Sequence, residues 1–422
     1  MTSPLDQSLT LPCGQTLPNR LMKSAMTENL ADAHDQPTAA LDRLYQRWSV
    51  GGTGLLVSGN VMVDRRYLER AGNVVVDEKV DRAALERMAR AGKTGGNAFW
   101  MQINHPGRQC PRLVNPQPLA PSAVQVHMLG MFSQPVAMTE ADIEDVIARY
   151  AYVARVARDT GFDGAQVHGA HGYLISQFLS PHVNRRTDQW GGPLENRARL
   201  LLRILGAVRE AVGADFAVGL KLNSADFQKG GFTLDDCVAV VEMINACGLD
   251  LLEISGGTYE ALALIGQTGD APPAGRESTR RREAYFLDYA RRIRAVATMP
   301  LAVTGGFRDR ALMEQAVADG EVDLIGLARP LCVDPDLSRK LLAQEAERAP
   351  DQDVSRLTIG ANSPRKLMRD IHAGSTYWYN HQINQLAAGR DADLRVGQIG
   401  GIVRHMVNDF RRVMARRRAQ PG

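Results

Sequence analysis

The sequence predicts a (β/α)8 barrel, the α/β TIM-barrel fold in which eight parallel strands alternate with helices around one closed sheet. Short apolar runs occur eight times along the chain, and a helical pattern of apolar residues follows each of them. A doubly wound open sheet would need a glycine-rich turn directly after its first strand, where this chain has Ala25-Met26-Thr27-Glu28. The barrel is therefore the better prediction.

Each expected strand is an apolar run of the length typical of strands buried on both faces. The expected strands are Leu21–Ala25, Leu55–Ser58, Ala98–Ile103, Gly164–Val167, Ala217–Leu222, Leu251–Ile254, Leu301–Val303 and Leu324–Gly326. Apolar residues spaced three or four apart predict the helices Ala39–Val50, Asp81–Thr94, Glu140–Thr160, Leu194–Val212, Leu234–Cys247, Glu283–Ala297, Arg308–Ala318 and Pro335–Leu342. The glycine run Gly51–Gly54 predicts the end of the first helix.

Additional segments are expected at both ends of the barrel. Leu9–Pro18 predicts a small hairpin that turns at Cys13-Gly14. We expect residues 1–346 to form the barrel and residues 347–422 to form a helical extension, too short for an independent domain with a good core. This extension is expected to contain two helices that dock on the barrel or on the partner subunit of a homodimer. Their apolar faces would be formed by Trp378, Tyr379, Ile383, Leu386, Ile402, Met406, Phe410 and Met414.

Composition indicates an ordinary soluble protein. The net charge of +3 gives no general attraction to nucleic acid, and the arginines near the C-terminus are expected to line a solvated helix face. No apolar run reaches the roughly 20 residues of a membrane span, and the N-terminus does not resemble a signal peptide, so a cytoplasmic location is expected. The five scattered cysteines include no C-x-x-C pair, which predicts reduced thiols and no metal.

Two histidines and a tyrosine follow the fourth expected strand. His168 and His171 are three residues apart, and Tyr173 comes two residues later. Functional groups of (β/α)8 barrels lie at the C-terminal ends of the strands and in the loops that follow. A long polar and aromatic loop is expected from these residues to the helix that begins at Leu194. The insert Gly266–Glu283, rich in Gly, Pro and charge, predicts a mobile loop over the same face.

The stretch from His168 to Arg199 resembles the old yellow enzyme family of FMN-dependent NADH:flavin oxidoreductases. It contains the family pattern H-x-x-[HN]-G-Y-L-x-x-Q-F-L-S-P-x-x-N-x-R-x-D-x-[YW]-G-G-x-x-x-N-R-x-R at every position. Several of these residues are expected to hold the loop and cap the helix, without a chemical role. They are Asn184, Arg186, Asp188, Trp190, Gly191, Gly192, Asn196 and Arg197.

The resemblance implies bound FMN, reduced by NADH or NADPH. The positions that match the family's flavin-binding residues are Ser24, Ala25, Met26, Thr27, Gly59, Gln102, Lys221, Gly305, Gly306, Ala328 and Arg329. Gln102 would hydrogen-bond the pyrimidine edge, since an amide both donates and accepts. The glycines and Arg329, after strands seven and eight, would bind the phosphate. Thr27 would hydrogen-bond a flavin carbonyl, although it is also an ordinary turn residue.

The resemblance also implies that an electron-poor alkene is reduced. His168 and His171 would bind the oxygen that activates the alkene, and Tyr173 would donate a proton. A structural role remains open for either histidine. Lys221 stands where most of the family has arginine, and a lysine inside a barrel also allows a Schiff-base lyase. A flavin binder without catalysis is the third hypothesis.

Overall fold

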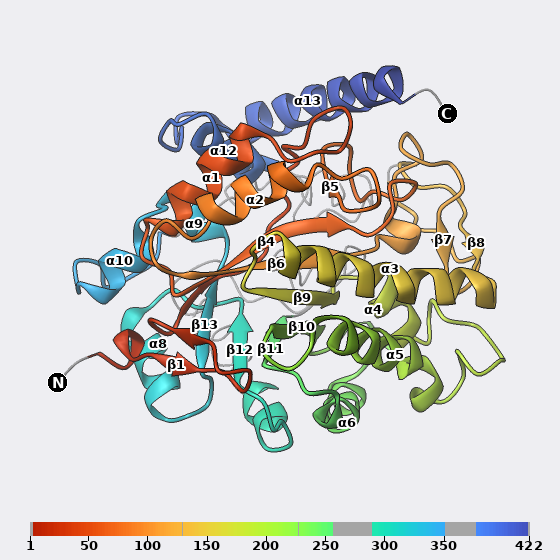
Figure 1. Ribbon diagram of the computed structural model, residues 1–422, viewed down its shortest axis with the longest axis horizontal. Coiled ribbons are helices and arrows are strands. Elements are labelled where there is room, and N and C mark those ends of the chain that lie inside the picture. The colour runs from red at the N-terminus through yellow and green to blue at the C-terminus, as the bar shows by residue number, and fades with distance from the viewer. Residues whose placement is uncertain (1–2, 129, 227, 256–288, 351–376, 421–422) are drawn as a thin grey trace.

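The computed structural model describes residues 3–128, 130–226, 228–255, 289–350 and 377–420 (Figure 1). Its centre is a closed barrel of parallel strands, in which the first strand pairs with both the second and the last. The barrel strands are β3 (Leu21–Lys23), β4 (Leu55–Met62), β6 (Ala98–Asn104), β9 (Gly164–Gly169), β10 (Ala217–Asn223), β11 (Leu251–Ser255), β12 (Leu301–Thr304) and β13 (Leu324–Leu327). The barrel and all eight of its predicted strands are therefore confirmed.

The predicted helices surround this barrel. They are α1 (Ala39–Ser49), α2 (Arg82–Ala91), α3 (Glu140–Asp159), α5 (Leu194–Val212), α6 (Leu234–Ile244), α8 (Arg310–Ala318) and α10 (Leu337–Leu342). The expected helix Glu283–Ala297 lies partly outside the described residues, and residues 289–294 are helical. Capping boxes start α3 at Thr139 and α6 at Thr233, where the side chain and an aspartate three residues later satisfy otherwise unpaired N–H groups.

The hairpin at the N-terminus fills one end of the barrel. Strands β1 (Leu9–Thr10) and β2 (Thr16–Leu17) are antiparallel, and Gly14 has a φ of 88°, as the predicted turn requires. Leu11 and Leu17 are buried in an apolar cluster with barrel residues such as Trp100. The predicted hairpin is thus confirmed, and it closes the barrel where the strands begin.

The barrel interior changes from apolar to polar along the strands. Next to the hairpin the inward side chains are apolar, whereas Gln102, Gln166, Lys221 and Glu253 lie further along β6, β9, β10 and β11 and are all buried. Because burying such groups costs free energy unless they are paired, a polar layer near the strand ends indicates a functional site.

Some elements were not expected from the sequence. The loop predicted after His168 contains the helix α4 (Leu174–Leu179), so the prediction of a loop without regular structure was wrong there. The other unpredicted elements are β5 (Val74–Val75), β7 (Leu119–Ala120), β8 (Val136–Ala137), α9 (Arg329–Val333), η1 (Pro4–Asp6), η2 (Gly107–Gln109) and η3 (Asn245–Cys247). The insert Gly266–Glu283 lies outside the described residues.

The C-terminal segment forms two helices that pack against each other, and the first of them lies beside α1, as Figure 1 shows. The first, α12 (Tyr377–Ala387), packs against α1 and α9 and buries its predicted apolar residues, including Trp378 and Ile383. The second, α13 (Gln398–Ala419), differs from the prediction, because Met406 and Phe410 are 62% and 59% exposed. Gly401, His405 and Val413 are buried on this helix instead.

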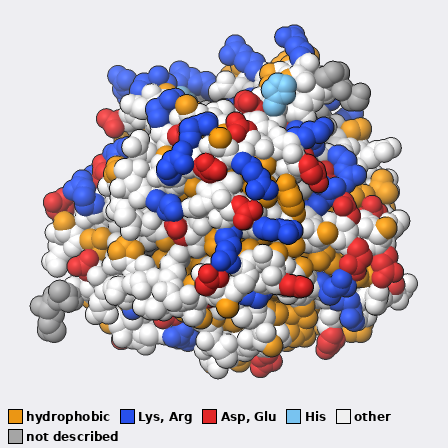
Figure 2. Space-filling model, in the orientation of Figure 1, with side chains coloured by type: hydrophobic (Ala, Val, Ile, Leu, Met, Phe, Trp, Pro, Cys, Tyr) orange, Lys and Arg blue, Asp and Glu red, His pale blue; other side chains and the backbone are white. Residues whose placement is uncertain are grey.

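The surface carries mixed charges. Figure 2 shows acidic and basic side chains interspersed over the visible face. In the part of the chain that the structure describes, no helix has the length and apolar character needed to cross a bilayer.

Candidate active site

His168, His171 and Tyr173 come together at the end of β9. The ring of His168 lies 5.1 Å from that of His171 and 4.9 Å from that of Tyr173, centroid to centroid, and both pairs meet edge to face. The Tyr173 side chain is buried, and α4 begins directly after it. One strand end and one helix start thus place two imidazoles and a phenol around one point.

The backbone of His171 has an unusual conformation that neighbouring side chains hold. Its φ of 62° is uncommon for a residue other than glycine and costs free energy. Asn223 accepts a hydrogen bond from its N–H at 3.1 Å, and Gln109 donates one to its carbonyl at 3.0 Å. Because β10 and η2 hold this residue from two sides, the position of its imidazole is well defined.

The hydrogen bonds of the two imidazoles constrain their protons. His168 accepts the N–H of Ala170 at Nδ1 (3.2 Å), which places the proton of the neutral ring at Nε2. Nε2 of His171 lies 2.9 Å from Oγ of Ser255, and if this hydroxyl donates, the His171 proton is at Nδ1. Each ring then has one N–H to donate to a ligand.

Burial keeps both imidazoles neutral. It lowers the pKa of His168 well below the ordinary value, and the neighbouring His171 and Lys221 lower it further. Burial and Lys221 likewise lower the pKa of His171. The two rings can therefore act near neutral pH as hydrogen-bond donors without a positive charge.

A hydrogen-bonded network crosses the barrel just inside these residues. Gln102 donates to Gln166 at 2.8 Å, and Gln166 donates to one carboxylate oxygen of Glu253, also at 2.8 Å. The hydroxyl of Thr304 donates to the other oxygen at 2.6 Å and also lies 2.6 Å from Oγ of Ser24. Two of the predicted flavin residues, Gln102 and Ser24, are thus at opposite ends of one network.

Lys221 enters this network through an ion pair. Its Nζ lies 2.9 Å from Oε1 of Glu253, and the two side chains are 3% and 0% exposed. Glu253 was not expected from the sequence, although its place near the end of the sixth barrel strand could have indicated it. An ion pair favours the charged form of a lysine, whereas forming a Schiff base needs the neutral amine. The pairing therefore supports an electrostatic role for Lys221.

The segment Ser24–Thr27 lies beside Gly59. The Gly59 N–H donates to Glu28 at 2.8 Å, and a β-carbon on Gly59 would collide with Glu28 and with the carbonyl of Met26. Packing within the protein therefore requires glycine at this position, whether or not a ligand is bound. Thr27 donates its hydroxyl to Glu69 at 2.8 Å, so its bond to a flavin carbonyl stays a prediction.

The predicted phosphate-binding residues lie on neighbouring strand ends. Gly305 and Gly306 follow β12 with φ values of 127° and 85°, which glycine adopts without strain. Ala328 and Arg329 follow β13, which pairs with β12. Successive backbone N–H groups in such a turn, beside a guanidinium, form a concave site suited to an anion. Together with the polar interior, this arrangement fits FMN.

The loop after α4 is held by the residues predicted to hold it. Asn184 donates to the carbonyls of Phe178 and Trp190 at 2.8 and 2.7 Å. Arg186 pairs with Asp188 at 2.5 Å, and Asn196 donates to the Gly191 carbonyl at 3.1 Å. Their predicted role in holding the loop is confirmed, whereas the predicted capping of α5 was wrong, because its N-cap residue is Pro193 and no side chain caps it.

Helix α12 contacts two of the predicted flavin residues, and sequence reasoning missed these contacts. Asn380 on α12 donates to the carbonyl of Thr27 at 3.1 Å. The guanidinium of Arg329 lies 6.0 Å from the ring centroid of Tyr379 on the same helix, within the range of a cation–π contact. No local signal indicates these contacts, because the partners are far apart in the sequence.

Comparison with known proteins shows which family of proteins this chain resembles. The model of the NADH:flavin oxidoreductase / NADH oxidase family matches residues 9–348. The chain is 37% identical over 356 residues to an NADH-dependent flavin oxidoreductase of Hypocrea jecorina (strain QM6a), covering 79% of this chain and 88% of that protein. A protein of the same description from Neonectria sp. (strain DH2) is 39% identical over 406 residues, which cover 89% of this chain but 53% of the relative. This chain thus spans about half the length of that relative.

A solved structure shares the fold. The old yellow enzyme homologue from Zymomonas mobilis superimposes with a TM-score of 0.71 over 83% of this chain and 95% of its own. At 24% sequence identity, this similarity concerns the barrel architecture.

Proposed function

Because the chain belongs to the NADH:flavin oxidoreductase / NADH oxidase family, an FMN-binding family of oxidoreductases, we propose that it reduces the C=C bond of an electron-poor alkene. NADH is the proposed reductant, since the two fungal relatives are described as NADH-dependent. FMN, when bound, would supply the redox chemistry, the transfer of a hydride from the nicotinamide to the alkene. Side chains of this protein would bind the substrate and donate the proton.

His168 and His171 are proposed to bind the carbonyl or nitro oxygen of the alkene. Negative charge develops on that oxygen as the double bond is reduced, and two N–H donors fixed in advance stabilise it. Tyr173 is proposed to donate the proton to the other alkene carbon. A phenol has a hydroxyl proton to donate, as a general acid must. The observation that carries the proposal is the contact of all three rings at one strand end.

The proposed flavin contacts divide between the barrel interior and two strand ends. Ser24, Gln102 and Lys221 would face the ring through the polar network, and Gly305, Gly306 and Arg329 would bind the phosphate. The Schiff-base lyase has less support, because Lys221 is paired with Glu253 and the family consists of oxidoreductases.

An anaerobic titration tests the proposed function. The purified holoenzyme should be bleached by NADH and should regain its colour when an enone, a nitroalkene or a maleimide is added. Recovery with oxygen but with none of these alkenes would contradict alkene reduction and leave a plain NADH oxidase.

A phenol tests the oxygen-binding role of the histidines without turnover. A para-substituted phenol should bind as phenolate against the oxidised flavin and produce a long-wavelength charge-transfer band. We expect His168→Ala and His171→Ala each to weaken this binding by about 1.5–3 kcal/mol, the contribution of a hydrogen bond to a charged group. Because the pKa of each histidine is lowered, binding should show no step near the ordinary histidine value of about 6.5.

The double variant gives the control for this prediction. The two histidines share one ligand oxygen, so their effects should be less than additive. Wild-type affinity in both single variants would mean that the substrate oxygen binds elsewhere.

A further inference from the structure

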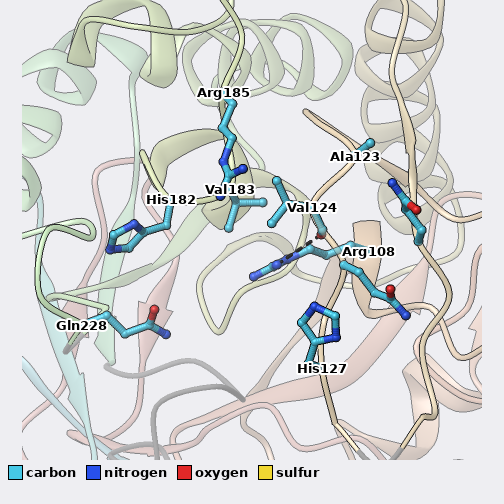
Figure 3. A pocket seen from close by; sticks show the side chains of 10 residues that line it. Arg108, Ala123, Val124, His127, His182, Val183, Arg185 and Gln228 are labelled. Atoms are coloured by element: carbon cyan, nitrogen blue, oxygen red, sulfur yellow. Dashed lines mark hydrogen bonds between the residues drawn. The ribbon is translucent and has the colours of Figure 1, made fainter.

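A second feature of the same face is a pocket of about 550 Å³ that the active-site residues do not line. It lies between the segment that carries Val124 and His127 and the segment His182–Arg185, as Figure 3 shows. This volume is in the range of pockets that bind small organic ligands, about 300–1,000 Å³.

The pocket is lined by basic side chains. Arg108, His127, His182 and Arg185 contribute to its walls, and none of its lining residues is Asp or Glu. The carboxylate of Asp226, which His182 influences electrostatically, is buried and accepts the N–H of Phe232 at 3.2 Å, so it does not line the pocket. A concave surface whose charged side chains are all basic concentrates anions.

Arg185 is the basic residue best placed to bind a ligand. Within the described part of the chain its guanidinium makes no hydrogen bond or ion pair, whereas that of its neighbour Arg186 pairs with Asp188 at 2.5 Å. The backbone of Arg185 is fixed by Ser122, which accepts its N–H at 3.0 Å. His182 already uses Nε2 to donate to the carbonyl of Lys229, at 2.8 Å. Arg185 can therefore give both of its parallel N–H groups to an anion.

Two segments of the chain link residues of the pocket to residues of the active site. Arg108 precedes Gln109, whose amide holds the carbonyl of His171. His182 and Arg185 follow α4, the helix that begins after Tyr173, and six helical residues span about 9 Å. The pocket and the three rings therefore border the same short segments of the chain.

We propose that this pocket binds the phosphate groups of a nucleotide whose reactive end lies beside His168, His171 and Tyr173. The inference rests on the proposed function. Two reactants contain such phosphates: the reductant NADH, through its diphosphate, and a substrate linked to a nucleotide, such as a coenzyme A thioester. Both contain a diphosphate, in which each tetrahedral phosphate presents two anionic oxygens that a planar guanidinium can bind with two parallel hydrogen bonds.

The test compares Arg185→Gln with two matched variants of the holoenzyme. Arg185→Lys keeps the charge but loses the planar fork. Arg155→Gln removes the same charge from an exposed position on α3, outside the pocket. The measurements are flavin bleaching by NADH and by 1-benzyl-1,4-dihydronicotinamide, which has the same ring without phosphate, and binding of ADP-ribose and coenzyme A by equilibrium dialysis.

We expect Arg185→Gln to raise the dissociation constants of NADH and ADP-ribose about tenfold, the effect of one charge-assisted contact at a partly exposed site. Benzyl-dihydronicotinamide should bleach this variant as it bleaches the wild type, and Arg185→Lys should recover part of the loss. If only coenzyme A binding weakens, the pocket still binds a nucleotide, and that nucleotide belongs to the substrate rather than to NADH.

Equal binding of NADH, ADP-ribose and coenzyme A in wild type and Arg185→Gln would overturn the proposal, as would an equal loss in Arg155→Gln. A failure of the proposed function gives a different result. In that case none of the alkenes restores the colour of the bleached wild-type flavin, while the dialysis still decides whether the pocket binds a nucleotide.

Discussion

Replacing Tyr173 with phenylalanine is expected to slow alkene reduction by about 10²–10⁴-fold, the usual contribution of a general acid, while flavin reduction by NADH stays nearly unchanged. The expectation follows from the position of the phenol, which is buried with its ring 4.9 Å from that of His168. Phenylalanine keeps the aromatic ring and therefore the packing, so the variant removes little more than the hydroxyl.

Stopped-flow measurement of the two half-reactions checks this prediction. Tyr152→Phe on α3 is the matched control, because its hydroxyl lies 3.5 Å from the Asp77 carbonyl, away from the three rings. An equal loss in both half-reactions of Tyr173→Phe would show that Tyr173 supports the structure of the site, as the residue before α4, without donating a proton.

Replacing Lys221 with methionine is expected to lower the free energy of unfolding by about 3–5 kcal/mol. The variant leaves the carboxylate of Glu253 fully buried, with hydrogen bonds from Gln166 and Thr304 but without its ion-pair partner. Removing one partner of a buried ion pair costs far more than removing both, because the remaining charge stays desolvated. The double variant Lys221→Met/Glu253→Gln should therefore recover most of the lost stability.

Denaturant unfolding of the two single variants and the double variant measures this coupling. The flavin reduction potential is an independent readout, since a cation near the ring favours the reduced, more negative form. We expect the potential to fall in Lys221→Met and to rise in Glu253→Gln. Additive stability losses would mean that the two side chains do not act as a pair in solution.

The barrel could be predicted because buried parallel strands are continuous apolar runs, and each is separated from the next by a helix with one apolar face. Helix α4 could not, because all six of its residues are buried and it therefore has no alternation of polar and apolar faces. The two-residue strands β5, β7 and β8 are too short to show any period.

The candidate site was predictable where its residues are neighbours in the sequence. His168, His171 and Tyr173 share one strand end, so their approach follows from the sequence spacing. Their partners Asn223 and Ser255 come from the next two strands, and that contact depends on the order of strands in the closed sheet. The contact of Asn380 with Thr27 joins residues 353 positions apart, which no local pattern encodes.

The hairpin that closes the barrel also bears on how the chain folds. Its backbone is anchored by Asp250, which accepts the N–H of Cys13 at 2.7 Å across 237 positions, and Gln15 accepts a hydrogen bond from Trp100. Contacts of such long range form slowly, because a large loop must close first. The hairpin is synthesised long before Asp250 and therefore waits for this partner, and we expect its amides to become protected last in pulse-labelled hydrogen exchange during refolding. Early protection of Leu11 and Leu17 would instead mean that the hairpin is a starting point around which the strands assemble.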